Sequence, residues 1–161
     1  MEGYEKVVVC GVSCDPITKQ PMVLLKVEGE NRLLPIWIGG PETAAILMKL
    51  QGRVCPRPLT HDLLASVIDG LSASLERVLV TEVRDNTVYA VLQLGAGDEE
   101  IAIDSRPSDA IALAMRTDAP IFVSTALLAT NGIEFEPQRE DVEEVVEEFQ
   151  TFLDQVSPED F

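Results

Sequence analysis

The sequence predicts an α+β fold in which a mixed, mainly antiparallel sheet packs against helices. Short apolar and β-branched segments are separated by turn residues, which is typical of strands joined as hairpins. Helical segments fall between groups of strands rather than after every strand, which argues against a doubly wound fold. The chain contains neither G-x-G-x-x-G nor G-x-x-x-x-G-K-[ST], so dinucleotide-binding and P-loop folds lose support.

The first half of the chain is predicted to hold three strands and two helices. We expect the strands at Lys6–Ser13, Met22–Val27 and Arg32–Ile38. A helix should begin near Pro41, which suits a first turn, with Glu42 at the favourable end of its dipole and Gly52 as its stop. Thr60 can cap a second helix, whose apolar residues share one face: Leu63, Leu64, Val67, Ile68 and Leu71.

The second half is predicted to contain a three-stranded meander, a helix and a short final strand. We expect these elements at Ser74–Arg84, Thr87–Leu94, Glu99–Asp104 and Pro107–Arg116. Ala119-Pro120 should end the helix. The segment Ile121–Ser124 then fits a short strand that leads into Thr125–Asn131.

Two segments of the chain resemble each other. IWIGGPETAAILMK and IAIDSRPSDAIALAMR each contain a strand, a turn, a proline, a carboxylate and an alanine-rich helix. Aligning Glu42 with Asp109 also matches Ala45 with Ala112, Met48 with Met115, and Lys49 with Arg116. Either a duplicated strand–helix unit or two ordinary helix starts would give this pattern. In both cases Glu42 and Asp109 lie at equivalent helix N-termini, beside free backbone N–H groups.

We predict a folded domain over residues 1–136 and an acidic amphipathic helix over residues 137–161. The apolar stripe of this helix recurs at three-four spacing: Val142, Val145, Phe149, Phe152 and Val156. From Glu134 to the C-terminus there are eleven acidic residues against Arg139 alone, a net charge of −10, which leaves −6 of the total −16 for residues 1–133. The helix either packs on its own domain or a second subunit, or it binds a protein partner.

The composition of the chain argues against a membrane protein, a secreted protein and a Cys/His zinc site. No apolar run approaches the roughly 20 residues of a membrane span, and the N-terminus lacks the features of a signal peptide. The three cysteines, Cys10, Cys14 and Cys55, are accompanied by one histidine, so no Cys/His zinc site is predicted. We expect buried free thiols and a cytoplasmic protein that does not bind membranes. Because both parts of the chain are acidic, the net charge disfavours nucleic acid as a partner.

The stretch IDSRPSDA at the start of the predicted helix Pro107–Arg116 has two interpretations. In the first, Asp104 or Ser105 caps the helix and Asp109 complements its dipole. In the second, these residues meet the other helix starts in one cleft. Clustered carboxylates can bind a divalent metal ion, arginine can hold phosphate and histidine can pass protons. The residues that would share this cleft are Glu42, Arg57, His61, Asp62, Asp104, Arg106 and Asp109.

The succession of LPIWIGGPETAAI, RPLTHDLL, VYAVLQL and IDSRPSDAIALAMR resembles the bifunctional nuclease family. The resemblance runs from about Val7 to Ile133 and implies a mixed α+β domain, a homodimer or larger homo-oligomer, and nuclease action on DNA and RNA. Plant members carry a further C-terminal domain for protein interaction, where this chain has only the acidic helix from about Pro137. The positions that match the family motifs are Glu42, Arg57, His61, Asp62, Asp104, Ser105, Arg106, Ser108 and Asp109.

We therefore expect a metal-dependent nuclease that hydrolyses phosphodiester bonds in DNA or RNA with Mg²⁺ or Mn²⁺. The candidate catalytic residues are His61, Asp62, Asp104, Asp109 and Glu42, of which Asp104, Asp109 and Glu42 would hold the metal. The candidate substrate-binding residues are Arg57, Arg106, Ser105 and Ser108. The alternative is a non-catalytic oligomeric module that binds a small anion or a protein partner. Convergence of the acidic residues with His61 in one cleft favours the enzyme, and separate capping roles favour the alternative.

Overall fold

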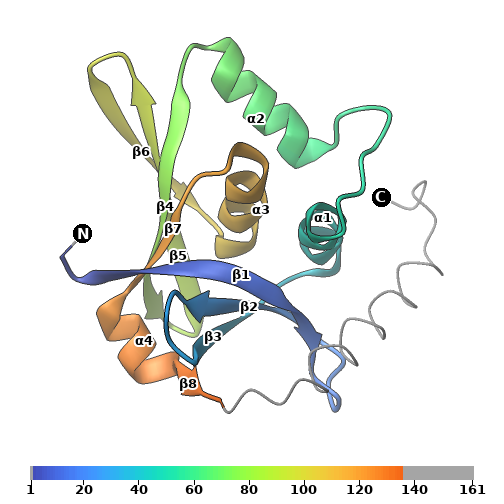
Figure 1. The fold of residues 1–161 in the computed structure, drawn as a ribbon, viewed down its shortest axis with the longest axis vertical. Helices are drawn as coiled ribbons and strands as arrows, with labels where there is room; N and C mark the ends of the chain where they lie inside the picture. The colour runs from blue at the N-terminus through green and yellow to red at the C-terminus, as the bar shows by residue number, and fades with distance from the viewer. Residues whose placement is uncertain (1, 136–161) are drawn as a thin grey trace.

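The computed structural model describes residues 2–135, which form an α+β domain built on one sheet. The described strands are β1 (Tyr4–Cys14), β2 (Pro21–Val27), β3 (Arg32–Trp37), β4 (Ser74–Arg84), β5 (Thr87–Ala96), β6 (Glu99–Ser105), β7 (Ile121–Ser124) and β8 (Ile133–Glu134). The described helices are α1 (Gly40–Leu50), α2 (Thr60–Gly70), α3 (Pro107–Thr117) and α4 (Thr125–Asn131). Figure 1 shows their arrangement.

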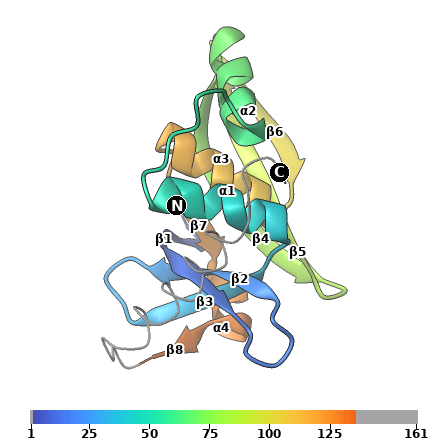
Figure 2. The ribbon, with the colours of Figure 1, turned by 90° about the vertical axis from the view of Figure 1, so that its right-hand side faces the viewer.

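The sheet has the strand order β6-β5-β4-β7-β1-β2-β3-β8. Neighbouring strands are antiparallel except β4 and β7, which are parallel. This order contains two meanders, β1–β2–β3 followed by α1 and β4–β5–β6 followed by α3, joined through β7. Figure 2 shows α1 and α3 side by side between the two meanders. The similarity seen in the sequence thus extends to a whole strand–strand–strand–helix unit.

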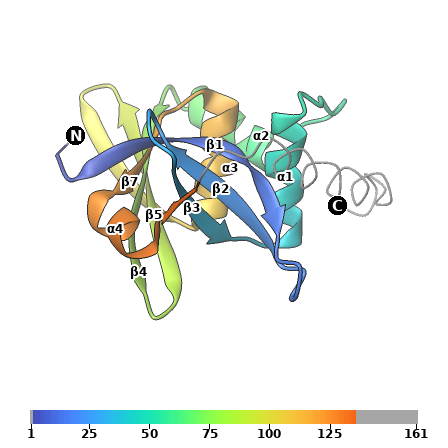
Figure 3. The same ribbon diagram turned by 60° about the horizontal axis from the view of Figure 1, so that its bottom comes forward.

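Helix α3 is the centre of the core, because its alanines let it approach its neighbours closely. Ala110, Ala112 and Ala114 are at most 1% exposed, and Ile111 and Leu113 are fully buried. The helix packs on α1 and α2 and against β4 and β5, while α1 covers β1 and β2. Helix α4 lies apart from the other three helices, against β3, β4 and β7 (Figure 3). These contacts fix the N-termini of α1, α2 and α3 on one side of the sheet.

Helix α2 departs from the expectation for an amphipathic helix. No residue of α2 is buried. Ala65 and Ile68 pack partly against the core, but the other apolar side chains are exposed: Leu63, Leu64, Val67 and Leu71. Thr60 is the first helical residue and not the predicted cap, since the N-cap position is Leu59. The backbone N–H of Leu59 donates to Asp62 Oδ2 over 3.0 Å.

Most predicted elements are confirmed to within two or three residues, and the α+β class is correct. Two features were not predicted: the short strand β8, and the parallel pairing of β7 with β4. Cys10, Cys14 and Cys55 form no disulfide with one another, and each is partly exposed rather than buried as expected. The predicted acidic helix and its boundary at residue 136 lie outside the described residues. Within residues 2–135, no helix is both long enough and apolar enough to cross a bilayer.

Candidate functional site

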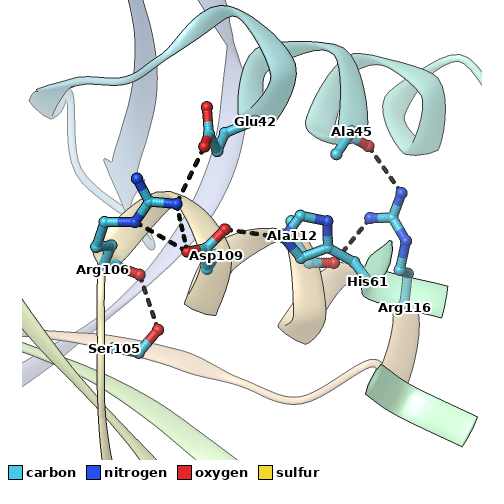
Figure 4. A network of polar contacts seen from close by, with 8 residues as sticks. All are labelled: Glu42, Ala45, His61, Ser105, Arg106, Asp109, Ala112 and Arg116. Atoms are coloured by element: carbon cyan, nitrogen blue, oxygen red, sulfur yellow. Dashed lines mark hydrogen bonds and ion pairs between the residues drawn. The ribbon is translucent and has the colours of Figure 1, made fainter. Parts of the chain in front are cut away.

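The N-termini of α1, α2 and α3 converge, and each contributes one residue to a single polar network (Figure 4). Glu42 lies in the first turn of α1, His61 in the first turn of α2 and Asp109 in the first turn of α3. Arg106, the N-cap residue of α3, completes the group. We call these four residues the helix-start network. Its assembly follows from the packing of α1 and α2 on the buried helix α3.

Arg106 joins the two carboxylates. Its Nη2 lies 3.1 Å from Glu42 Oε1 and 2.9 Å from Asp109 Oδ2, and its Nε donates to the same Asp109 oxygen over 3.0 Å. These hydrogen bonds and charges, chiefly those of Asp109, raise the pKa of Arg106 above its already high value, so the side chain remains a cation. The Arg106 side chain is 69% exposed, whereas that of Glu42 is 17% exposed. The network therefore exposes the Arg106 guanidinium to solvent, while the carboxylates of Glu42 and Asp109 hold it in place.

Asp109 also holds His61. The His61 Nε2 and Asp109 Oδ1 atoms are 3.0 Å apart, and the imidazole is only 12% exposed. An ionised carboxylate can only accept hydrogen bonds, so Nε2 carries the proton in this contact. In the neutral ring, Nδ1 is then the basic nitrogen. A carboxylate that orients an imidazole in this way is the arrangement that general acid–base chemistry needs.

Asp62, the neighbour of His61, belongs to a second contact group. Its Oδ1 accepts from Arg116 Nε over 2.7 Å, while Arg116 also donates to the carbonyls of Ala112 and Ala45 over 2.8 and 3.0 Å. Burial of the Asp62 carboxyl opposes ionisation, but the Leu59 N–H and Arg116 outweigh it and lower its pKa. Arg116, with a side chain only 8% exposed, thus ties all three helices together. Asp62 therefore stabilises the packing of α2 on α3 through Arg116 and is not part of the helix-start network.

Four other predicted site residues lie outside the helix-start network. Asp104 is exposed near the end of β6, and Ser105 Oγ donates to the Arg106 carbonyl over 2.9 Å. Neither side chain caps α3, whose N-cap makes no side-chain hydrogen bond, so that prediction is wrong. Ser108 is buried in the first turn of α3. Arg57 is exposed in the loop before α2, with no ion pair to any residue between 2 and 135.

The predicted metal ligands do not form a ligand set in this conformation. Glu42 and Asp109 both contact Arg106, and Asp104 does not join them. Across residues 2–135, no three His, Cys, Asp or Glu side chains are grouped so that they could hold a metal ion. A divalent ion would have to displace the Arg106 guanidinium from the two carboxylates. The requirement for Mg²⁺ or Mn²⁺ therefore stays a prediction.

Two residues that the sequence did not single out shape this region. Gly39 is the N-cap residue of α1, and a Cβ at this position would collide with Glu42 Oε2. The absent side chain therefore lets the Glu42 carboxylate fold back over the helix start. The only sequence signal for this role is the paired glycine before Pro41. Arg116 gave no signal of its own, because a basic residue in the last turn of a helix is ordinary.

Known proteins are similar in sequence to this chain. The model of the bifunctional nuclease domain matches residues 23–136. An uncharacterized protein of Mycobacterium tuberculosis strain H37Rv is 40% identical over 159 residues, which cover 95% of each chain.

Two plant proteins are also similar. Bifunctional nuclease 1 of Oryza sativa subsp. japonica is 30% identical over 115 residues, and bifunctional nuclease 1 of Arabidopsis thaliana is 28% identical over 117 residues. The aligned parts cover 69% and 70% of this chain but only 35% and 36% of the plant proteins. The matched region is thus about a third of each plant protein. All four residues of the helix-start network fall inside the range that the domain model matches.

Proposed function

Because the chain belongs to the bifunctional nuclease domain family, we propose that it hydrolyses phosphodiester bonds of DNA or RNA at the helix-start network. The observation that carries this proposal is the convergence of Glu42, His61 and Asp109 on one exposed arginine. Capping alone would not bring side chains from three separate helices together. An imidazole held by a carboxylate can serve as an acid–base group, and an exposed guanidinium can stabilise charge on a phosphate.

Arg106 is the proposed phosphate-binding residue. Guanidinium groups bind phosphate oxygens through parallel N–H donors, and most of this side chain is open to solvent. Its Nη1 has no hydrogen-bond partner among residues 2–135, so one side of the guanidinium is available to a phosphate. Glu42 and Asp109 hold the group in place, which lowers the entropy that it loses when substrate binds.

His61 is the proposed proton carrier. With Nε2 donating to Asp109, Nδ1 can take a proton from the attacking water and return one to the leaving oxygen. Asp109 keeps the imidazole in this tautomer and stabilises the charge that it gains. The same carboxylate contacts Arg106, so one residue couples phosphate binding to proton transfer.

The proposed metal dependence is a separate prediction with its own test. Chelation should abolish cleavage, and Mg²⁺ or Mn²⁺ should restore it, if Asp104, Asp109 and Glu42 bind an ion when substrate enters. Asp104→Asn discriminates between cleavage that needs a metal ion held by Asp104 and cleavage by the helix-start network alone. Asp104 is a ligand in the first mechanism and lies outside the helix-start network. A loss with this variant supports the metal hypothesis, whereas unchanged cleavage argues against Asp104 as a ligand.

The direct test is cleavage of single- and double-stranded DNA and RNA by the native chain and two variants. We expect His61→Gln and Arg106→Met each to lower kcat/KM about 100-fold or more, because the first removes a positioned acid–base group and the second removes a cation that stabilises the phosphate. Asp98→Asn, an exposed carboxylate in the turn between β5 and β6, is the matched control and should cleave normally. No cleavage by the native chain, or equal cleavage by all variants in folded form, would refute the proposal.

A further inference from the structure

Helix α2 leaves an apolar surface without a partner in the described part of the chain. We define the α2 face as Leu63, Leu64, Val67 and Leu71, which are between 38% and 75% exposed. In the loop before α2, Val54 is 91% exposed. Helices of globular domains normally turn such a stripe toward a core, and contiguous exposed apolar residues mark interaction surfaces. Something outside residues 2–135 is therefore needed to cover the α2 face.

The same chain carries a second apolar stripe that matches the first in spacing. Val142, Val145, Phe149, Phe152 and Val156 alternate steps of three and four residues, and they lie outside the described part of the chain. Leu64 and Val67 of α2 and Leu71, its C-cap residue, repeat the same alternation. Two helices with this spacing can pack side by side along an apolar seam.

The segment that precedes α2 and the C-terminal segment carry opposite charges. Between Glu42 and Asp62 the chain has three cations, Lys49, Arg53 and Arg57, and no carboxylate. This segment includes the loop that leads into α2. By contrast, the segment from Glu134 to the C-terminus has eleven acidic residues and one arginine. Opposite charges at the rim of an apolar contact favour that pairing and fix its register.

The length of the C-terminal segment limits the direction in which it could run along the α2 face. Strand β8 ends at Glu134, at the end of the molecule opposite from α2 (Figure 1). A compact domain of this size is about 37 Å across. Eight extended residues reach Val142 within about 27 Å, and a helix from there to Val156 adds about 21 Å. Residues 142–156 would therefore reach the α2 face only if the segment ran away from β8, which would bring its N-terminal part toward the loop that contains Arg57.

We propose that residues 140–156 form a helix that packs on the α2 face of the same chain. Phe149, Phe152 and Val156 cover Leu64, Val67 and Leu71, and the acidic residues before Phe149 lie beside the three cations of segment 49–57. Because His61 lies in the first turn of α2, this contact places the acidic segment next to the helix-start network. The contact itself does not depend on nuclease activity, so its test measures structure alone.

The test is amide hydrogen exchange of residues 142–156 in the full-length chain. We expect exchange in the native chain at least about tenfold slower than in Leu71→Asp, because the substitution removes the apolar contact. Leu71 is 75% exposed, so the variant should fold normally. The matched control is Ile17→Asp, which charges an apolar residue that is 90% exposed in the β1–β2 turn, and it should keep the protection.

Three outcomes would overturn the proposal. Residues 142–156 could exchange at the unprotected rate in the native chain. Leu71→Asp could leave their protection unchanged, which would mean that nothing of this segment touches α2. Protection could also disappear on dilution together with a dimer seen by light scattering, which would assign the α2 face to a second copy. Protection that is independent of protein concentration and lost in Leu71→Asp supports the contact within one chain.

Discussion

The two halves of the sheet have the same arrangement of strands and helix but carry different polar residues at the start of the helix. The β1–β2–β3–α1 half and the β4–β5–β6–α3 half each place a carboxylate in the first turn of the helix that comes after the meander. Glu42 from the first half and Asp109 from the second contact the same guanidinium. The halves differ at the N-cap, which is Gly39 in α1 and Arg106 in α3. The scaffold supplies two equivalent acids, and a single cap residue supplies the cation between them.

A second difference lies in the segment after each helix. After α3 the chain turns directly into β7, whereas after α1 it forms a long loop and then α2. That addition brings His61 to Asp109, so only the acid of the second half contacts both the cation and the imidazole. Equivalent positions in the two halves therefore carry unequal chemical roles. Variants of the two acids can measure this inequality.

The largest expected effect comes from Asp109→Asn compared with Glu42→Gln. Asp109→Asn removes the charge that contacts both Arg106 and His61, so we expect kcat/KM for nucleic-acid cleavage to fall about 100- to 1,000-fold. Glu42→Gln removes one contact to Arg106 and should cost about 10-fold. Steady-state kinetics of the two variants provide the comparison. Equal losses would contradict the unequal roles of the two acids.

A smaller effect, on stability, is expected from Asp62→Asn. The substitution weakens the ion pair with the nearly buried Arg116, and we expect the free energy of unfolding at pH 7 to fall by about 1–2 kcal/mol, since solvent screens the partly exposed carboxyl. The pKa of Asp62 is lowered in the folded state, so its contribution is complete above the ordinary carboxyl pKa of 3.8 and lost as the pH falls through the lowered pKa.

Urea unfolding at a series of pH values measures this contribution. The stability difference between the native chain and Asp62→Asn should be constant near neutrality and should shrink below pH 3.8. A difference that grows on acidification would show that the ionised form of Asp62 does not stabilise the fold.

The smallest expected effect comes from Gly39→Ala, which tests the N-cap difference between the halves. Gly39 has a φ of −79°, which alanine adopts freely, so the variant adds only a Cβ that collides with the Glu42 carboxylate. We expect a loss of activity of about 3- to 10-fold, close to that of Glu42→Gln. Gly40→Ala is the matched control, because a Cβ there meets nothing within 4 Å. If both alanine variants retain full activity, the position of the Glu42 carboxylate is not important for cleavage.

Local signals in the sequence were enough to predict the elements, but not the contacts between them. Strand and turn residues identified both meanders, and Pro41 and Pro107 marked the starts of α1 and α3. The alignment of Glu42 with Asp109 anticipated their equivalent positions. However, the contacts of Arg116 with Asp62 and with the Ala45 carbonyl join residues that are 54 and 71 positions apart. Such contacts depend on how the helices pack, which no local pattern encodes.

The candidate site shows the same limit. The sequence grouped seven residues because their types suit metal and phosphate chemistry, and the structure brings four of them into one network. Asp104 was included because it lies in the same stretch as Asp109, but it is an exposed residue near the end of edge strand β6 and does not join the network. The α2 face illustrates the same limit. Its spacing identifies an apolar stripe but says nothing about which partner covers it.

The most direct test of the helix-start network as a catalytic unit is a double-mutant cycle. The kcat/KM for single-stranded nucleic acid would be measured for the native chain, His61→Gln, Arg106→Met and the double variant. Both side chains are held by Asp109, so the double variant should lose about as much activity as the more damaging single variant, roughly 100-fold. Losses that multiply to about 10,000-fold would show that the two residues act independently and would contradict a single network.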